Sequence, residues 1–374
     1  MPDRHNLSGN DVERQEPAQC RPVPSTAAGT DPAIPATGPE PCQIQAGPLK
    51  WVPWRIGPVG FRRLALASIV LLTAIILTGG VVRLTGSGLG CSDWPQCFRH
   101  HFVAPDSFHP LVEFSNRMFT IVLTAVLAAT AIASLIRRPY RRDLAIWSWA
   151  LVGGVFAQAI LGGVVVLSGL FPPFVMLHFL LAIVMVGAAV VLHWRAGRPD
   201  TKPVVTVGPE VLWLSRLILL VLGAVLVAGT ATAMAGPSVG SVGAQRLPVS
   251  FAAVAQLHAD IVWLLIGLTL AMQFLVHHER SPMPTQNRAH ILLYVMIAQG
   301  AIGYIQYFTH VPLGLVELHM FGATLVCIAA IRLHLGLFNR QPASSGAGAS
   351  GAHRGEAAVL PAPTMRSARS AVVS

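Results

Sequence analysis

The sequence predicts an all-α integral membrane protein in which eight transmembrane helices form two pseudo-symmetric four-helix bundles. Charged residues make up 11% and apolar types 53% of its 374 residues, whereas soluble domains carry roughly 25% charge. The mean hydropathy is +0.60. Residues 144–194 contain no charged side chain, and that stretch is long enough for two spans of about 20 residues each.

An internal repeat is the third observation behind this fold class. A glutamine is followed after 20 residues by a histidine and after 15 more by a second histidine, once in each half of the chain. The repeated residues are Gln158, His178 and His193, and then Gln299, His319 and His334. Because histidine is costly inside a membrane, a histidine repeated in two apolar halves predicts a bound metal or haem.

Apolar runs predict the spans at residues 62–83, 112–136, 143–167, 174–195, 211–234, 252–276, 289–309 and 315–338. The two bundles would occupy residues 59–196 and 211–340, joined by a linker at 197–210. Residues 1–58 and 341–374 are rich in Pro, Ala, Gly and Ser, so both are expected to be disordered tails. No cleavable signal peptide is expected, because the first long apolar run begins near Leu64.

The distribution of basic residues predicts the orientation in the membrane. They gather at alternate connections, as Arg55, Arg62 and Arg63, then Arg137, Arg138, Arg141 and Arg142, then Arg195, Arg198 and Lys202, then Arg280 and Arg288. The opposite connections hold little beyond Arg99 and Arg246. The positive-inside rule therefore places both termini and both tails in the cytoplasm. The formal net charge of +10 follows from this topology, and it does not indicate a nucleic-acid partner.

The five cysteines fall into different compartments. Cys20 and Cys42 lie in the first tail, and Cys327 lies in the last span, where a thiol packs as a small apolar group. Cys91 and Cys97 flank five residues in the first external loop. Their spacing favours a disulfide in an oxidising compartment, and a redox-active pair or two free thiols are the alternatives.

Three histidines are candidate haem ligands, one on each of the fourth, sixth and eighth spans. His178, His258 and His319 share a depth of roughly 6 to 10 Å below the external ends of their spans. The corresponding residue of the second span is Asn116, since it precedes His178 by 62 residues and His258 precedes His319 by 61. The second half thus offers two histidines, which suit an electron-transfer haem, and the first offers one, which leaves an iron position open for chemistry.

The first half also carries polar groups that the second lacks. Glu113, Asn116 and Arg117 fall on one helical face, and Arg83 lies at the external end of the first span. Glu113 and Arg117 could act in catalysis or form a structural ion pair.

The other histidines have simpler interpretations. A single membrane histidine could do no more than hydrogen bond a neighbouring helix. His193 and His334 lie at the cytoplasmic ends, where a snorkelling interfacial histidine is the commoner outcome. A second haem layer with His277 and His278 is disfavoured, because the second span offers no matching histidine. Histidines in or beside external loops could guide haem or be solvated, and these are His100, His101, His109 and His310.

Four ordered motifs resemble those of the haem A synthase family, in the form seen in actinobacteria. They are GGVVRLTGSGLGCSDWP at residues 79–95, VEFSNR at 112–117, AQLHAD at 255–260 and QGAIGYIQY at 299–307. The resemblance runs from about residue 60 to residue 338 and omits both tails. It implies oxidation of the C8 methyl group of haem O to a formyl group through hydroxylated intermediates, which supplies haem A to a terminal oxidase.

The same resemblance implies roles for individual residues. His258 and His319 would ligate a haem b cofactor, and His178 would ligate the iron of the substrate haem O. Glu113 would accept a proton or stabilise a cationic intermediate near the methyl group. Arg83 and Arg117 would bind haem propionates.

It also implies partners and a location. A haem O synthase would deliver the substrate, an unidentified acceptor would take the electrons, and terminal oxidase assembly would use the product. The protein would lie in the lipid bilayer of a bacterial cell membrane, and a homo-oligomer is compatible with this interpretation. Two departures from the family pattern stand out: Asn116 where many members have histidine, and AGPS at residues 235–238, which lacks the histidine that often follows Gly-Pro.

Two other function classes remain open. A two-haem electron-transfer cytochrome needs only the repeated histidines, and a haem carrier would bind haem exchangeably in both halves. Glu113 distinguishes the enzyme from both, because neither alternative requires a carboxylate there.

Overall fold

The computed structural model describes residues 48–49, 51–98, 101–237 and 240–340. Its helices are α1 Pro58–Leu84, α2 Phe108–Ile136, α3 Arg142–Leu167, α4 Pro172–Ala196, α5 Pro209–Ala235, α6 Phe251–His278, α7 Met283–Phe308 and α8 Leu313–Gly336. The predicted tails, with Cys20 and Cys42, lie outside the described residues apart from a few positions beside α1, and so does His100.

All eight helices are long and apolar enough to cross a membrane, which confirms the predicted fold class. The helices differ from the predicted spans mainly at their ends. α7 begins at Met283 rather than at residue 289. A proline favours the start of a helix, and the first turn is too polar to be included in a span predicted from hydropathy. α8 ends at Gly336 because Phe338 and Asn339 pair with another segment as a strand.

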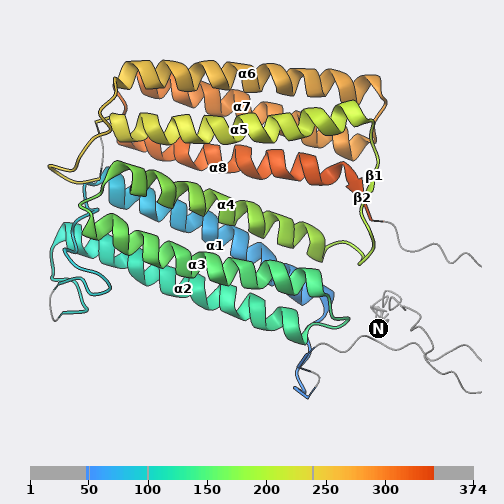
Figure 1. The fold of residues 1–374 in the computed structure, drawn as a ribbon, viewed down its shortest axis with the longest axis horizontal. Coiled ribbons are helices and arrows are strands. Elements are labelled where there is room, and N and C mark those ends of the chain that lie inside the picture. The colour runs from blue at the N-terminus through green and yellow to red at the C-terminus, as the bar shows by residue number, and fades with distance from the viewer. Residues whose placement is uncertain (1–47, 50, 99–100, 238–239, 341–374) are drawn as a thin grey trace, which may run out of the picture.

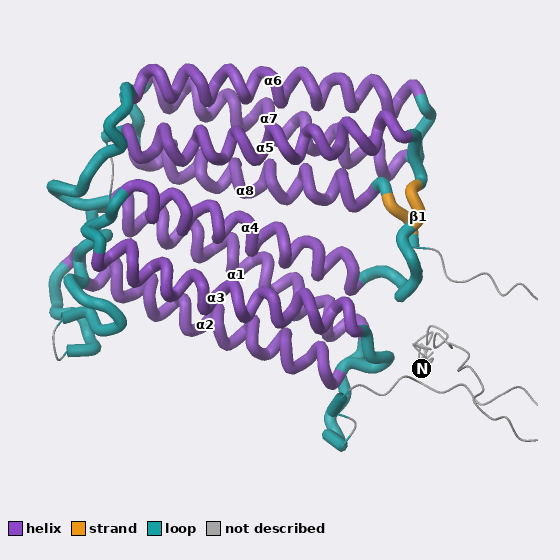
Figure 2. The backbone as a smooth tube through the Cα atoms, viewed as in Figure 1, coloured by secondary structure: helices purple, strands orange, loops and turns teal. Residues whose placement is uncertain are grey.

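The helices form two groups of four, α1–α4 and α5–α8, which run side by side (Figure 1). α1 and α4 of the first group contact α8, and α4 also contacts α5. A short antiparallel ribbon pairs β1 Val204–Val205 with β2 Phe338–Asn339, in orange in Figure 2, and thereby ties the linker between the groups to the end of α8. The chain is a multi-pass membrane protein whose two halves are in contact through these helices and through the ribbon.

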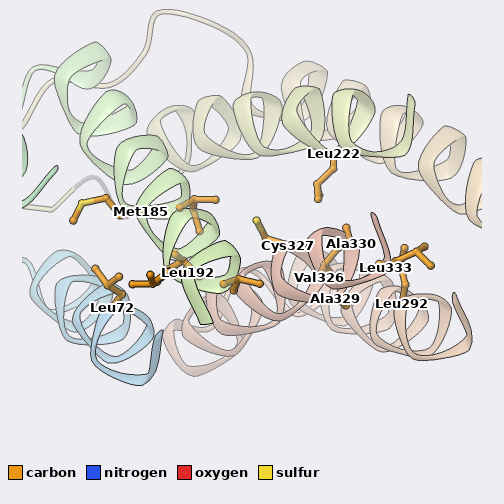
Figure 3. Close-up of a cluster of buried hydrophobic side chains, with 14 of the residues drawn as sticks. Leu72, Met185, Leu192, Leu222, Leu292, Val326, Cys327, Ala329, Ala330 and Leu333 are labelled. Carbon is orange, nitrogen blue, oxygen red and sulfur yellow. The ribbon is translucent and has the colours of Figure 1, made fainter. Parts of the chain in front are cut away.

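One apolar core runs through both groups without interruption. Figure 3 shows part of it, with α4 between α1 and α8. Small residues let these helices approach closely, since an added Cβ at Gly187 of α4 would lie 3.0 Å from Cδ1 of Ile331 on α8. The labelled core residues are Leu72, Met185, Leu192, Leu222, Leu292, Val326, Cys327, Ala329, Ala330 and Leu333.

The two ends of the helices differ in chemistry. We call the end that carries the Cys91–Cys97 loop the disulfide end, and the end that carries Arg141, Arg195 and Arg340 the arginine end. At the arginine end Asp143 lies 2.8 Å from Nη2 of Arg141, 3.6 Å from Arg195 and 3.8 Å from Arg340. One carboxylate thus holds the start of α3, the end of α4 and the segment after α8 together.

Candidate functional site

His258 of α6 and His319 of α8 face each other across the second group of helices. Their ring centroids lie 6.3 Å apart, with the ring planes at 73°. A metal ion with an imidazole nitrogen about 2 Å away on each side separates the ring centres by about 6 Å. The spacing of the two rings would therefore allow both to ligate one iron.

Both rings line a cavity of about 780 Å³, which falls within the roughly 300 to 1,000 Å³ of ligand pockets. Its walls come mainly from α5 to α8, with Val175, Met176 and Phe179 contributed by α4. Apolar side chains dominate the lining, and the paired imidazoles are its principal metal-binding groups. A haem with two histidine ligands would suit this arrangement, because such a group needs an apolar slot and two imidazoles.

A glycine on the preceding helix makes room for each candidate ligand. An added Cβ would lie 3.0 Å from Cε1 of His258 at Gly229, 3.0 Å from Cε1 of His319 at Gly303, and 3.3 Å from Cε1 of His178 at Gly162. All three rings thus pack directly on the backbone of a neighbouring helix. Gly162 and Gly303 each precede their histidine by 16 residues, a repeat that could have been found in the sequence together with the glutamines.

The repeated glutamines hold the helix at the repeated histidines. Nε2 of Gln158 donates to the His178 carbonyl at 3.0 Å, and Nε2 of Gln299 donates to the His319 carbonyl at 2.7 Å. This contact explains the repeated spacing of 20 residues. His258 is oriented differently, because its Nδ1 lies 3.1 Å from the Val225 carbonyl. A carbonyl only accepts, so Nδ1 carries the proton and Nε2 is left free to bind a metal.

In the described part of the first group of helices, His178 is half-buried and its Nδ1 atom is enclosed. Asn116 lies on α2, where its Oδ1 accepts a hydrogen bond from Oγ1 of Thr78 on α1 at 2.7 Å. The Asn116 carbonyl oxygen is thus engaged with a neighbouring helix, and amides are poor iron ligands. The two halves differ in donor set as the sequence predicts.

Glu113 is buried, with 5% of its surface exposed, and it joins α2 to the loop after α1. Its Oε2 accepts the Cys91 amide hydrogen at 2.8 Å, and its Oε1 lies 2.5 Å from Nη2 of Arg117. Nη1 of Arg117 donates to the Asp93 and Gln96 carbonyls, both at 3.0 Å. The Glu113–Arg117 ion pair therefore holds the loop after α1 against α2.

Cys91 and Cys97 form a disulfide in that loop, with their Cα atoms 4.3 Å apart, which confirms the favoured pairing. Gly90 packs on the start of α2, where an added Cβ would lie 2.8 Å from the Pro110 nitrogen. The Trp94 ring packs on α3, where an added Cβ at Gly163 would lie 2.8 Å from it. Since Gly162 beside it accommodates His178, the loop brings Trp94 to the region of that imidazole.

Arg83 lies beside the second group of helices, although the sequence groups it with the polar residues of the first half. It belongs to α1, but it lines the cavity of the second group, and its Nη2 donates to the Ala233 carbonyl of α5 at 2.7 Å. Arg83 therefore belongs to the paired-histidine site rather than to the surroundings of Glu113. The reason is the close packing of α1 on the second group, which sequence alone does not reveal.

Glu317 is a residue that the sequence motifs did not single out. Its two carboxylate oxygens are buried and have no hydrogen-bond partner among the described residues. The carboxylate packs on α1, where an added Cβ at Gly80 would lie 2.9 Å from Cδ, and it interacts electrostatically with Arg83. An available signal was that Glu317 is the only acidic residue of the last predicted span.

The other histidines that the structure describes have local partners or face outwards. Nδ1 of His193 lies 3.3 Å from the Arg62 carbonyl, and Nδ1 of His334 lies 2.9 Å from the Ser215 hydroxyl. His277 and His278 are exposed at the end of α6. Within the described residues no group of three or more His, Cys, Asp or Glu side chains could hold a metal ion. Paired imidazoles are thus the metal-binding arrangement that this part of the chain presents.

A family model described as "Cytochrome oxidase assembly protein", COX15-CtaA, matches residues 62–331. The chain belongs to this family. The match covers all eight helices except parts of α1 and α8, so the COX15-CtaA family accounts for both halves of the repeat. It also includes the three candidate histidine ligands, Glu113 and the disulfide.

Several curated relatives are named heme A synthase. The protein from Alkalihalophilus pseudofirmus is 27% identical over 147 residues, which is 37% of this chain and 50% of that protein. Those from Lysinibacillus sphaericus and Listeria welshimeri are 28% identical over 141 residues and 29% identical over 143 residues, covering 45% and 46% of their lengths. The chain thus spans about half the length of the curated relatives that it matches.

Proposed function

We propose that this protein is a haem A synthase, which oxidises the C8 methyl group of haem O to a formyl group through hydroxylated intermediates. The observation that carries the proposal is the asymmetry of the two halves. The second half has two candidate ligands, whose ring centroids lie 6.3 Å apart, whereas the first has one, His178, in the half that also contains Glu113. Membership of the COX15-CtaA family and the names of its relatives support this assignment.

In this proposal His258 and His319 hold a haem b cofactor. When bound, haem b accepts electrons one at a time. Gly229 and Gly303 leave space for the two imidazoles, and the Val225 carbonyl fixes the His258 ring so that Nε2 points away from α5. Arg83, a permanently charged fork in the same cavity, would bind a propionate.

His178 holds the iron of the substrate haem O in the first half. Glu113 accepts a proton as the methyl group is oxidised, since each oxidation step releases protons as well as electrons. The loop closed by Cys91 and Cys97 packs on this half, with Trp94 against Gly163 of α3. Arg117 orients the Glu113 carboxylate, so its expected contact with a haem propionate would require it to leave the loop carbonyls.

We further propose that the protein lies in the cell membrane of a bacterium, with the arginine end and both termini on the cytoplasmic side. The positive-inside rule supports this orientation, and the disulfide fits the oxidising external side. A haem O synthase would supply the substrate. A separate electron acceptor would take the electrons, and assembly of a terminal oxidase would use the product.

The test is mass analysis of haems extracted from membranes that contain this protein and a source of haem O. Wild type is expected to yield haem A. Glu113→Gln should lower haem A about 100-fold, the lower end of the range for a general base, and accumulate haem O or a hydroxylated intermediate while haem b content is kept. Glutamine keeps an acceptor for the Cys91 amide, so the loop should stay intact, and mapping the Cys91–Cys97 disulfide checks this.

Asp260→Asn is the matched control, because it removes one carboxylate from a helix of the other half, where Asp260 accepts from Gln256. It should leave haem A production unchanged. Haem b alone in wild type, with no C8 oxidation, would refute the synthase. That result would favour a di-haem electron-transfer cytochrome, for which the paired imidazoles suffice, over a haem carrier, which would release its haem.

A further inference from the structure

We propose that four arginines between the two halves, at the arginine end, bind the phosphate of an anionic phospholipid in the cytoplasmic leaflet. This inter-bundle arginine cluster consists of Arg62, Arg198, Arg288 and Arg332. The inference goes beyond the proposed oxidation. It depends on the location of these side chains in the membrane, and its test does not use catalytic activity.

The cluster draws on both halves of the molecule. Arg62 belongs to α1 and Arg198 follows α4, whereas Arg288 and Arg332 belong to α7 and α8. The Trp194 ring of α4 joins them, because the guanidinium carbons of Arg198 and Arg288 lie 4.4 Å and 5.0 Å from its centroid. A stacked tryptophan therefore holds one arginine from each half side by side.

Two glycines fix the guanidinium groups further. An added Cβ at Gly197 would lie 3.1 Å from Nε of Arg62, and one at Gly336 would lie 2.9 Å from Cζ of Arg288. Both guanidinium groups thus rest against backbone at the ends of α4 and α8. Arg62 is nevertheless exposed, so a lipid headgroup can reach it.

The positive charge of the cluster is not neutralised. The electrostatic neighbours of Arg288 are Arg198 and Arg332, and those of His193 are Arg62 and Arg332. Among the described residues no carboxylate forms an ion pair with any of the four arginines. By contrast, Arg141, Arg195 and Arg340 share Asp143. Like charges gathered without an acid make a site for an anion.

The depth of the cluster indicates which anion it meets. Arg62 and Arg288 lie four and five residues inside the starts of α1 and α7, and Arg332 lies four residues before the end of α8. At 1.5 Å per residue these positions lie about 6 to 8 Å inside the helix ends, and helices of 24 to 29 residues reach into the headgroup layer. Basic pockets between helices at this level of the cytoplasmic side suit lipid headgroups.

The surface beside the cluster suits the acyl chains of a lipid. Leu66 and Val70 follow Arg62 at four-residue intervals on α1, so they lie on its face of the helix. They are 48% and 57% exposed. A phospholipid can place its anionic phosphate beside the guanidinium group of Arg62 and its hydrocarbon chains along Leu66 and Val70. Free phosphate would use only the first of these contacts.

The experiment is native mass spectrometry of the delipidated protein, titrated with phosphatidylglycerol or with phosphatidylcholine. Wild type is expected to retain one phosphatidylglycerol in preference to phosphatidylcholine. Arg288→Gln combined with Arg332→Gln should weaken phosphatidylglycerol binding about 30-fold, since each arginine near anionic lipid contributes about fivefold to affinity. Arg63→Gln combined with Arg280→Gln is the matched control, because it removes two exposed charges from the same end outside the cluster.

Three results would overturn the proposal. They are equal binding of the two lipids by wild type, equal weakening by the control pair, and displacement of the lipid by millimolar inorganic phosphate, which would indicate a site for free anions. Haem content of each variant reports whether it has folded. Should the first pair fail that check, Arg62→Gln removes one exposed arginine of the cluster, and it should weaken binding about fivefold.

Discussion

Single glycines determine where the candidate ligand rings can lie. Gly162, Gly229 and Gly303 each face an imidazole on the next helix, and the rings approach to within 3.0 to 3.3 Å of an added Cβ. The histidines could be predicted from sequence, because an ionisable residue inside an apolar run stands out. Gly162 and Gly303 recur 16 residues before their histidines, so the repeat offers a signal for these two. Gly229 offers no such signal, because only contact with the His258 ring distinguishes it from other glycines of the chain.

Gly303→Val should therefore weaken haem binding in the second half. The new side chain pushes on the His319 ring, and overpacking of this kind costs about 2 kcal/mol, or about 30-fold in affinity. The bis-histidine absorption of the purified protein measures the haem content. Gly267→Val in α6 of the same half is the control, since nothing lies within 4 Å of an added Cβ there and Gly267 is not among the residues that line the cavity. Equal loss of haem from both variants would contradict the role assigned to Gly303.

The loop between α1 and α2 is the element that sequence predicts only in part. Its disulfide followed from the spacing of two cysteines and an external location. Its attachment did not, because the acceptor for the Cys91 amide is Glu113, 22 residues later in the chain. The sequence left open whether Glu113 and Arg117 act in catalysis or form a structural ion pair. The two roles are compatible, since the carboxylate that we propose for proton transfer also anchors the loop.

Gly163→Val should loosen this loop. An added side chain there meets the Trp94 ring, which lies 2.8 Å from the Cβ position, and the loop must lift away from α3. Trypsin added from the disulfide side should then cleave after Arg99 roughly tenfold faster, as expected if about 1.4 kcal/mol of packing is lost. Cleavage after Arg246 in another loop of the same side serves as the internal reference.

Gly153→Val is the matched control for this element, because nothing lies within 4 Å of an added Cβ at Gly153 of α3. It should leave the ratio of the two cleavage rates unchanged. An unchanged ratio in Gly163→Val as well would show that Trp94 does not hold the loop down.

At the scale of the whole molecule, the sequence repeat predicts two groups of helices but not how they join. Arg83 illustrates the difference, because it is an α1 residue in the cavity of the other half. Glu317 and the inter-bundle arginine cluster likewise acquire their neighbours only when α1 and α4 pack on α8. Patterns along one chain report which face of a helix is apolar, and the pairing of faces between duplicated halves depends on side-chain shape.

The same packing leads to a prediction about sidedness. The described helices bring the start of α1 and the end of α8 to the arginine end, where Asp143 links Arg195 of α4 to Arg340 beyond α8. A protease-cleavable tag after Ser374 should therefore be removed in inverted membrane vesicles and protected in right-side-out vesicles, because basic connections stay in the cytoplasm. Cleavage after Arg99 should show the opposite preference. Removal of the tag in intact right-side-out vesicles would show that the orientation is the opposite of the proposed one. The inter-bundle arginine cluster would then lie at the outer leaflet.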